Sequence, residues 1–302
     1  MLPLHFAFVT PQHRMSVDDI RQLWDFADST GWDSAWFFDH LTSLDGPDDE
    51  PCLEAWSLLA AMAERTRRVE IGVFVSGVTH RSPAILAKQA VTVDHLSDGR
   101  LILGIGAAWN AREHAAYGLD FPPMRERVDR VGEALELIRA LEGDARSTYE
   151  GEFYRLSDAP FEPKFVRRRV PILIGTKGPR MMRHLARWAD AWEGGGSPEQ
   201  MLALGRELDR ACEEVGRDPA KISRGILADN GSPAKRPLAS DAAFRTHVEA
   251  YVQVGVDAFY FNVPSGPPSK ALRSISERVI PELREAHSAG ALARAGVDQR
   301  PV

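Results

Sequence analysis

The stretch that decides the fold is RLILGIGAAWNAR, residues 100–112. Residues 101–103 form a short run of Leu and Ile that follows an Asp-Gly turn pair. A run of this kind indicates a strand that is buried on both faces, as the strands of a parallel sheet are. The strand leads into a Gly-x-Gly pattern, whose glycines let the backbone approach another group closely. The stretch therefore predicts a buried parallel strand that ends at a candidate binding position.

Trp109 and Asn110 follow this pattern, at the predicted carboxyl end of the strand. A flat aromatic ring beside an amide suits a planar polar ligand, although Trp109 could also simply cap the core of a barrel. The stretch is not a dinucleotide fingerprint, because that motif needs a third glycine where Trp109 stands and an acidic residue about 20 positions later. The residues alone leave both interpretations of Trp109 open.

Strand-like and helix-like segments alternate along the rest of the chain. The expected strands lie at residues 4–9, 35–38, 69–75, 101–103, 170–174, 190–193, 222–228 and 257–262, and the expected helices at 16–30, 53–65, 82–96, 124–141, 178–187, 197–215, 241–254 and 270–284. Eight such units predict an α/β fold, a (β/α)₈ TIM barrel, whose usual length is about 250 residues. The alternative is a doubly wound open sheet, which usually has fewer strands.

No linker or shift in composition divides the alternation, so we expect a single barrel domain over residues 1–287. Residues 143–169 break the rhythm and contain a small hairpin candidate at 149–155, which indicates an insertion. Residues 229–240 form a second insertion, a loop rich in Gly, Pro and Ser that is long enough to act as a lid. Residues 288–302 are rich in Ala and Gly, and we expect a flexible tail there.

Composition excludes several classes of function. The formal net charge of −6 argues against a broad nucleic-acid surface. No run of 18 apolar residues occurs, so no membrane span is expected, and the N-terminus lacks the pattern of a secretory signal. Cys52 and Cys212 are isolated, which predicts no disulfide framework and a reducing, cytoplasmic location. No His-Glu-x-x-His or Cys-x-x-Cys motif is present, so we predict no metal site.

In a barrel, the functional groups lie at the carboxyl ends of the strands. Asp39 and His40 follow the expected strand 35–38. They could form an acid–base element, because imidazole titrates near neutral pH. Alternatively, Asp39 caps the loop and His40 is a buried, hydrogen-bonded histidine. The residues alone do not decide between these interpretations.

A second candidate is the sequence GTKGPR, residues 175–180, which follows one strand and opens a helix. Free backbone N–H groups, the helix dipole, a hydroxyl and two cations could together hold a phosphate. It is not a Walker loop, and the alternative is an ordinary Gly-Pro turn with solvated cations. Residues 75–78 end the third expected strand with a Ser-Gly pair, which suits a bulge or a strained peptide.

Taken together, these segments resemble the bacterial luciferase-like superfamily, and more closely its coenzyme F420-dependent oxidoreductases. The likeness spans residues 4–283, and its central block is the most specific part. The segments that carry it are WFFDH (36–40), SP (82–83), AKQ (87–89), DGRL (98–101), GIGAAWN (104–110), Glu113, YG (117–118), FP (121–122), Arg127, IG (174–175), GPR (178–180) and ADAW (189–192).

The resemblance implies a barrel that holds a deazaflavin or a flavin at the strand ends, usually in a homodimer. It places His40 near the reactive ring as the catalytic candidate, and the Phe74–Val75 peptide at the position of a non-proline cis bond behind the ring. It implies that Trp109 and Asn110 line the cofactor pocket, and that the 175–180 turn holds the cofactor phosphate. The implied cofactor-binding residues are Asp39, His40, Phe74, Val75, Ser76, Ala107, Trp109, Asn110, Gly175, Thr176, Lys177, Gly178 and Arg180.

Two positions depart from the family pattern. Sugar-phosphate dehydrogenases of this family carry an acidic Glu directly after the Gly-x-Gly, where this chain has Ala107, so that substrate class is in doubt. Thr176 and Lys177 stand where many relatives have glycines, which favours neither cofactor.

The predicted function is hydride transfer between F420 and a small organic substrate, with His40 as proton donor or ring stabiliser. The alternatives are an FMN-dependent monooxygenase, a non-catalytic relative that binds a flavin or nothing, and a metal-dependent barrel hydrolase. Substrate contacts are expected from the loops at 41–51, 143–169 and 229–240.

Overall fold

The computed structural model describes residues 2–44, 47, 49–228 and 236–290. Within these residues, one sheet is built from β1 (His5–Val9), β2 (Ser34–Phe37), β3 (Glu70–Val73), β4 (Ser76–Gly77), β5 (Leu101–Gly106), β8 (Ile172–Gly175), β9 (Ala191–Glu193), β10 (Ser223–Leu227) and β11 (Ala258–Asn262). Neighbouring strands run parallel in the order β3-β2-β1-β11-β10-β9-β8-β5-β4, and β3 also pairs with β5. This last pairing closes the sheet, which confirms the predicted (β/α)₈ barrel over the open sheet.

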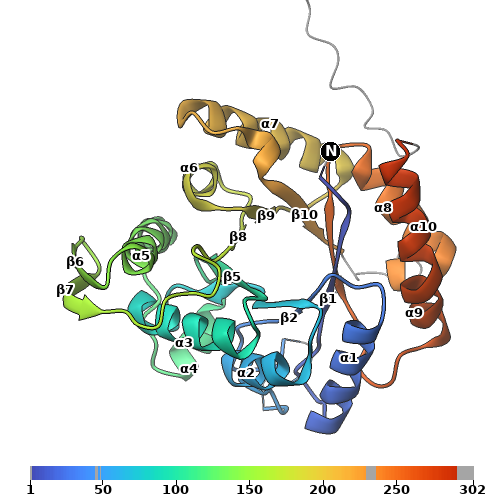
Figure 1. Cartoon of the computed structure of the whole chain (residues 1–302), viewed down its shortest axis with the longest axis horizontal. Helices are drawn as coiled ribbons and strands as arrows, with labels where there is room; N and C mark the ends of the chain where they lie inside the picture. The colour runs from blue at the N-terminus through green and yellow to red at the C-terminus, as the bar shows by residue number, and fades with distance from the viewer. Residues whose placement is uncertain (1, 45–46, 48, 229–235, 291–302) are drawn as a thin grey trace, which may run out of the picture.

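Helices form a layer around the strands, as Figure 1 shows. They are α1 (Val17–Ser29), α2 (Ala55–Arg65), α3 (Pro83–Leu96), α4 (Ala111–Ala116), α5 (Met124–Gly143), α6 (Pro179–Trp188), α7 (Pro198–Glu214), α8 (Asp241–Val252), α9 (Lys270–Ser274) and α10 (Ile280–Ser288), with the short turns η1 (Pro219–Lys221), η3 (Pro237–Ala239) and η4 (Ile275–Val279). Among the residues described, no helix is both long enough and apolar enough to span a membrane.

The helix starts follow from local side-chain chemistry. The Ser16 hydroxyl accepts a hydrogen bond from the Asp19 N–H at 3.1 Å, and so caps α1. Ser197 and Gln200 form a reciprocal capping box at the start of α7. These caps fix where each helix leaves the preceding loop, and so hold the loops at the carboxyl end of the barrel in place.

Aromatic side chains fill the barrel interior. Trp36, Phe74 and Tyr260 are buried there, with ring centroids 5.9 Å apart for Trp36–Phe74 and 4.5 Å apart for Phe74–Tyr260. This packing closes the interior, so the open space of the molecule lies above it, at the strand carboxyl ends.

Arg100 holds the opposite, amino end of the barrel together. Its guanidinium donates to the carbonyls of Ala63, Thr66, Val69 and Ser97 at 2.7–2.9 Å, and to the Thr66 hydroxyl at 2.9 Å. These acceptors come from the segment between α2 and β3 and from the end of α3. One side chain therefore ties two connections to the start of β5.

The prediction of a single strand over residues 69–75 is wrong. β3 ends at Val73, the Phe74–Val75 peptide is cis, and the chain resumes pairing as β4. The Phe74 N–H still donates to the Phe37 carbonyl at 2.7 Å, whereas Ser76 pairs with Ile105 of β5. The apolar composition of this stretch hides the point where the chain leaves β2 and continues to pair with β5 alone. The cis bond lies where the family resemblance implied it.

The predicted helix over residues 270–284 is also interrupted. η4 is a π turn between α9 and α10. Pro281 lacks the N–H that an α-helical bond to residue 277 would need, and this favours a locally wider turn. Within η4, the Ser276 hydroxyl accepts a hydrogen bond from the Trp32 indole N–H at 2.8 Å.

The predicted hairpin in the 143–169 insertion is present but longer than expected. β6 (Arg146–Glu150) and β7 (Arg155–Pro160) pair antiparallel, so a hairpin is present, but the predicted span 149–155 covers only its tip. Figure 1 shows this hairpin next to α5, at the edge of the molecule. Most of the expected lid and most of the expected tail, residues 229–235 and 291–302, lie outside the described residues.

We expect Gly72→Ala to destabilise the barrel. A Cβ at Gly72 would lie 2.3 Å from Cζ3 of Trp36 and 2.5 Å from the Ile102 carbonyl oxygen. Overpacking of this kind should lower the free energy of unfolding by about 2–3 kcal/mol, measured by urea denaturation. The matched control is Gly143→Ala at the end of α5, where a Cβ would meet nothing within 4 Å. Equal unfolding midpoints for the two variants would contradict the expectation.

Candidate active site

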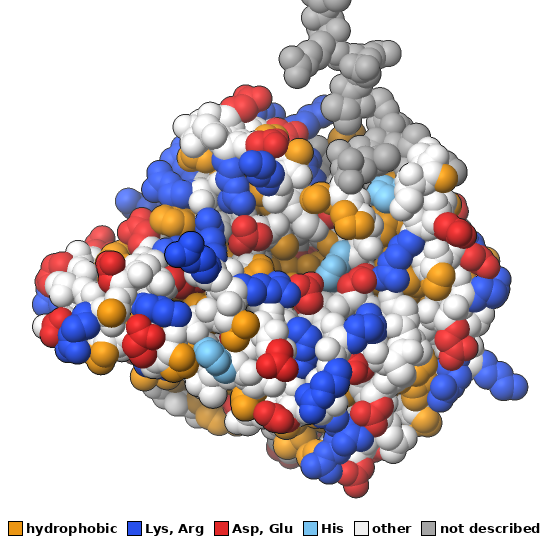
Figure 2. All heavy atoms as spheres, in the orientation of Figure 1, with side chains coloured by type: hydrophobic (Ala, Val, Ile, Leu, Met, Phe, Trp, Pro, Cys, Tyr) orange, Lys and Arg blue, Asp and Glu red, His pale blue; other side chains and the backbone are white. Residues whose placement is uncertain are grey.

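A cavity of about 1780 Å³ opens at the carboxyl ends of the strands. Figure 2 shows the viewed face hollowed near its centre, with apolar, charged and histidine side chains gathered around the hollow. Of the residues expected to bind the cofactor, the cavity is lined by Asp39, His40, Phe74, Val75, Ala107, Trp109, Asn110, Gly175, Thr176, Lys177, Gly178 and Arg180. Ser76 is the exception: it is buried, and its hydroxyl accepts from the Trp56 indole N–H at 3.2 Å.

Asp39 is a buried anchor just beyond β2. Its carboxylate accepts two hydrogen bonds from the Arg81 guanidinium at 2.7 and 2.9 Å, one from the Gly77 N–H at 2.9 Å and one from Nδ1 of His80 at 3.1 Å. Burial alone would raise the pKa of Asp39, but the hydrogen bonds from His80 and Arg81 hold that pKa well below its usual range. Asp39 therefore stays ionised and fixes the 77–81 segment to the end of β2.

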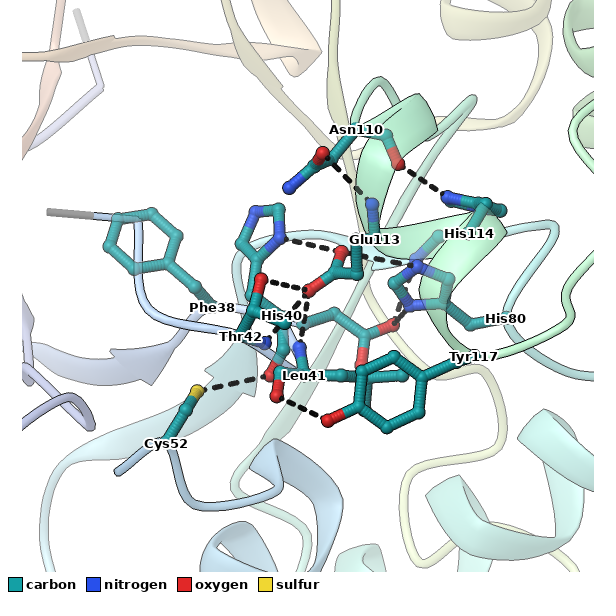
Figure 3. A network of polar contacts seen from close by, with 12 residues as sticks. Phe38, His40, Leu41, Thr42, Cys52, His80, Asn110, Glu113, His114 and Tyr117 are labelled. Atoms are coloured by element: carbon teal, nitrogen blue, oxygen red, sulfur yellow. Dashed lines mark hydrogen bonds and ion pairs between the residues drawn. The ribbon is translucent and has the colours of Figure 1, made fainter. Parts of the chain in front are cut away.

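His40 is held by a second buried carboxylate, Glu113 from the first turn of α4. Nδ1 of His40 lies 3.0 Å from Oε2 of Glu113, whose side chain is fully buried (Figure 3). The other oxygen of Glu113 accepts from the backbone N–H groups of Leu41 at 2.5 Å and Thr42 at 3.1 Å. Burial opposes ionisation, yet these hydrogen bonds lower the pKa of Glu113. An ionised Glu113 therefore fixes a proton on Nδ1 of His40.

His80 connects the two carboxylates. Its Nδ1 bonds to Asp39, and its Nε2 lies 3.9 Å from Oε2 of Glu113. The result is a continuous row of charged and titratable groups that runs from Arg81 through Asp39, His80 and Glu113 to His40. His40 is thus neither a core histidine nor an isolated one, because it ends a network and faces the cavity.

The sequence reasoning did not select Glu113 or His80 as site residues. A usable signal existed for Glu113, because Asn110 caps α4 and Glu113 stands three residues later, as in a capping box. In a capping box the Glu side chain returns to the backbone of the cap, whereas here it reaches across to His40. No local pattern marks His80.

His80, Glu113 and His114 each place a potential ligand atom within 4.8 Å of the others. His114 already uses both ring nitrogens, with Nδ1 2.8 Å from the Asn110 carbonyl and Nε2 2.7 Å from the Thr79 hydroxyl. Since the oxygens of Glu113 are also engaged, we describe the group as a hydrogen-bonded cluster.

Trp109 lies at the rim of the cavity. Its side chain is 64% exposed, so it does not cap the barrel core. The indole stands edge-on to the His40 ring, with centroids 5.4 Å apart and an interplanar angle of 67°. Ala108, just before it, has a φ of +54°, a region that costs a non-glycine residue about 1 kcal/mol. That backbone turn directs Trp109 over His40.

The 175–180 turn forms another part of the cavity wall. The Thr176 hydroxyl accepts from the Gly178 N–H at 3.1 Å, which shapes the turn before α6. Arg180 is tied to Asp129 of α5, with Nε 2.9 Å from the Asp129 carboxylate. The N-terminus of α6 and the Lys177 ammonium remain as the electropositive groups of the turn, and both suit an anionic ligand.

Comparison with known proteins now identifies the family. Residues 3–300 match the sequence model of the luciferase-like monooxygenase family. The chain belongs to this family. A curated relative from Kineococcus radiotolerans, named F420-dependent glucose-6-phosphate dehydrogenase, is 31% identical, and the match covers 85% of this chain and 90% of the relative. A protein of the same name from Nakamurella multipartita is 32% identical, with 93% and 97% covered.

Among solved structures, an F420-dependent secondary alcohol dehydrogenase in complex with an F420–acetone adduct matches with a TM-score of 0.79. That match covers 94% of this chain and 98% of the other at 17% identity, so it shows the shared luciferase-like fold. The resemblance drawn from the sequence is thereby confirmed.

In this luciferase-like barrel, we expect Asp39→Asn to lower the free energy of unfolding by about 3 kcal/mol at pH 7, because it breaks a buried ion pair. The pKa of Asp39 is depressed by folding, so its stabilisation is present above about pH 4 and is lost as the pH falls below that value. Urea denaturation should show the gap between wild type and variant narrowing by about 1.4 kcal/mol per pH unit below pH 4.

The control is Asp18→Asn, which removes an exposed carboxylate that forms an ion pair with exposed Arg21. A gap between wild type and Asp39→Asn that stays constant down to pH 2.5 would argue against an ionised Asp39.

Proposed function

We propose that this chain is an F420-dependent oxidoreductase that transfers a hydride between the deazaflavin and a small organic substrate. The observation that carries the proposal is that His40, held by a buried carboxylate, and the electropositive 175–180 turn line the same cavity. A histidine and an anion-binding turn around one large cavity are what a phosphate-bearing redox cofactor with a proton-coupled reaction requires. The names of the curated relatives support F420 as that cofactor.

The residues around the cavity fit such a cofactor. Thr176, Lys177 and the N-terminus of α6 would hold its phosphate, while Trp109 and Val75 offer flat and apolar surfaces for its ring. The volume of about 1780 Å³ exceeds the usual range for a single small ligand, so a substrate has room beside the cofactor.

When bound, F420 supplies or accepts the hydride. The protein must then move a proton, because reducing a carbonyl to an alcohol adds a hydride to carbon and a proton to oxygen. Glu113 accepts a hydrogen bond from the Nδ1–H group and stabilises the charged imidazolium, so Nε2 of His40 is the nitrogen left to exchange a proton in the cavity. Trp109 excludes water from one edge of the His40 ring.

We also propose that the substrate differs from the sugar phosphates of the named relatives. Ala107 stands where the sugar-phosphate dehydrogenases of the family carry an acid, and a methyl group cannot donate a proton. His40 has to serve the reaction without that second acid, which favours a smaller alcohol or carbonyl compound.

An FMN-dependent monooxygenase is the second candidate. It is favoured by the 175–180 turn, whose groups recognise a phosphate without distinguishing which ring carries it.

The homodimer and the cytoplasmic location remain predictions. Size-exclusion chromatography with light scattering would test the dimer.

The first test is to titrate the ligand-free protein with F420 and, separately, with FMN, following ligand fluorescence. We expect saturable binding of F420 and weaker or no binding of FMN. Preference for FMN would favour the monooxygenase, and failure of both titrations would favour a non-catalytic relative.

Lys177→Ala should weaken cofactor binding about tenfold in the same titration, because it removes a cation at the phosphate turn.

The second test addresses His40. If His40 moves the proton, His40→Ala should lower kcat for F420-linked oxidation or reduction by about 10²–10⁴-fold while leaving F420 binding nearly unchanged. His95→Ala on the outer helix α3 is the control, because His95 is exposed and its ring bonds to the Lys164 carbonyl, away from the cavity. Full activity of His40→Ala in the presence of bound F420 would remove His40 from the catalytic role.

A further inference from the structure

Glu193 is a cavity-lining carboxyl group that the proposed reaction does not use. It ends β9, which lies four strands from β2 around the barrel, so Glu193 faces His40 across the mouth. Its partners in register are Gly175 on β8 and Gly225 on β10. Residues in register point to the same side of a sheet, so both neighbours of Glu193 on that side lack a side chain. At Gly225 the Tyr260 ring fills this space, since a Cβ there would lie 2.6 Å from Cε2 of Tyr260, whereas on the Gly175 side the space beside the carboxyl group is left open.

Glu193 has few partners in the protein. Its Oε1 accepts one long hydrogen bond, from the Leu227 N–H at 3.4 Å. In the described part of the chain, no Lys, Arg or His nitrogen lies within the 4.0 Å of an ion pair with it. The Lys177 stem instead packs over Gly195, where an added Cβ would meet Cε of Lys177 at 2.3 Å.

The surroundings let this carboxyl group hold its proton to a much higher pH than an exposed glutamate does. Burial raises the pKa of Glu193 to about 7, against the smaller opposing effects of the Leu227 N–H and the Lys177 charge. From β11, the phenol of Tyr260 also faces Glu193, and burial raises its pKa as well, so it stays neutral. Arg224 of β10 pairs with Asp209 and does not compensate Glu193.

The open space has a shape that suits the edge of a flat ring. An ideal Cβ at Gly175 would lie 3.4 Å from Oε2 of Glu193 and 3.8 Å from Cγ2 of Val75. The carboxyl group and the Val75 methyl groups therefore border the same volume. A flat ring that packs one face on Val75 would present its edge to Glu193.

A protonated carboxyl group places a donor and an acceptor next to each other. It is complementary to an edge that carries a carbonyl beside an N–H, because each group then finds a partner. An ionised carboxylate would instead set a second acceptor against the carbonyl. The pyrimidinedione ring common to F420 and FMN carries such an edge.

We propose that Glu193, in its protonated form, binds the carbonyl–N–H edge of the cofactor's pyrimidinedione ring. This inference rests on the proposed function, because it requires a deazaflavin or flavin in the cavity. It makes cofactor affinity dependent on pH, because ionisation of Glu193 removes the donor. Affinity should fall as the pH rises above the pKa of Glu193 in the ligand-free protein, and should level off above the higher pKa of the complex.

The test measures the dissociation constants of F420 and of FMN between pH 5.5 and 9 for wild type, Glu193→Gln and Glu193→Ala. Glutamine keeps a donor beside an acceptor and does not titrate, so it should bind with the low-pH affinity of wild type. The ratio of the wild-type to Glu193→Gln dissociation constants cancels titration of the ligand itself. It should be near one at pH 5.5, should rise by up to about tenfold per pH unit above the ligand-free pKa of about 7, and should level off at the bound-state pKa.

Glu193→Ala should bind about tenfold more weakly than Glu193→Gln at every pH, because it removes both hydrogen bonds. Glu213→Gln, an exposed position on α7, is the matched control and should follow wild type. A ratio that stays near one at all pH values, or an alanine variant that binds normally, would overturn the inference while leaving the proposed function intact. Binding of neither cofactor to wild type would overturn both.

A second readout needs no ligand. Folding raises the pKa of Glu193, so its contribution favours the folded state at low pH and is lost as the pH rises through about 7. The unfolding midpoint of wild type should therefore fall, relative to that of Glu193→Gln, between pH 5 and 8. Parallel midpoints over that range would show that Glu193 is ionised in the folded protein and would overturn the proposal.

Discussion

The buried carboxylate of Glu113 is the interaction on which the site depends. It is fully buried, and it accepts hydrogen bonds from two backbone N–H groups after β2 and from His40. An ion in such a place persists only if its hydrogen bonds replace the water that it has lost. The packing of residues 40–42 against α4 is thus coupled to the orientation of His40. If the His40 ring turned, Glu113 would lose a hydrogen bond and its buried charge would be less well compensated.

Two carboxyl groups on opposite sides of the mouth show how the environment assigns roles. Glu113 is surrounded by donors and stays ionised, whereas Glu193 has one long hydrogen bond and a raised pKa of about 7. Both are glutamates near strand ends, and both have lost part of their contact with water. The number of donors that each can reach, and not the residue type, decides which of them is an acceptor and which can donate.

The barrel could be predicted from the sequence because its signals are local. Apolar runs such as residues 101–103 and caps such as Ser16 lie within a few positions of the element that they define. The site network could not be predicted in this way. His40 and Glu113 are 73 positions apart, and the open space beside Glu193 exists because Gly175, on another strand, stands in register with it. The break between β3 and β4, at residues 74–75, could not be predicted either, because the apolar side chains there continue the pattern of a single strand.

The hydrogen bonds of Arg100 affect how the sequence of this protein can evolve. Arg100 secures the amino end of the barrel with five hydrogen bonds, far from the mouth where the cavity lies. The Arg100 hydrogen bonds that stabilise the fold therefore lie at the amino end of the barrel, and the candidate catalytic groups lie at its carboxyl end. Loops at the mouth can therefore change in length or sequence to fit new substrates without disturbing the hydrogen bonds of Arg100. In this chain, evolvability and robustness depend on different residues.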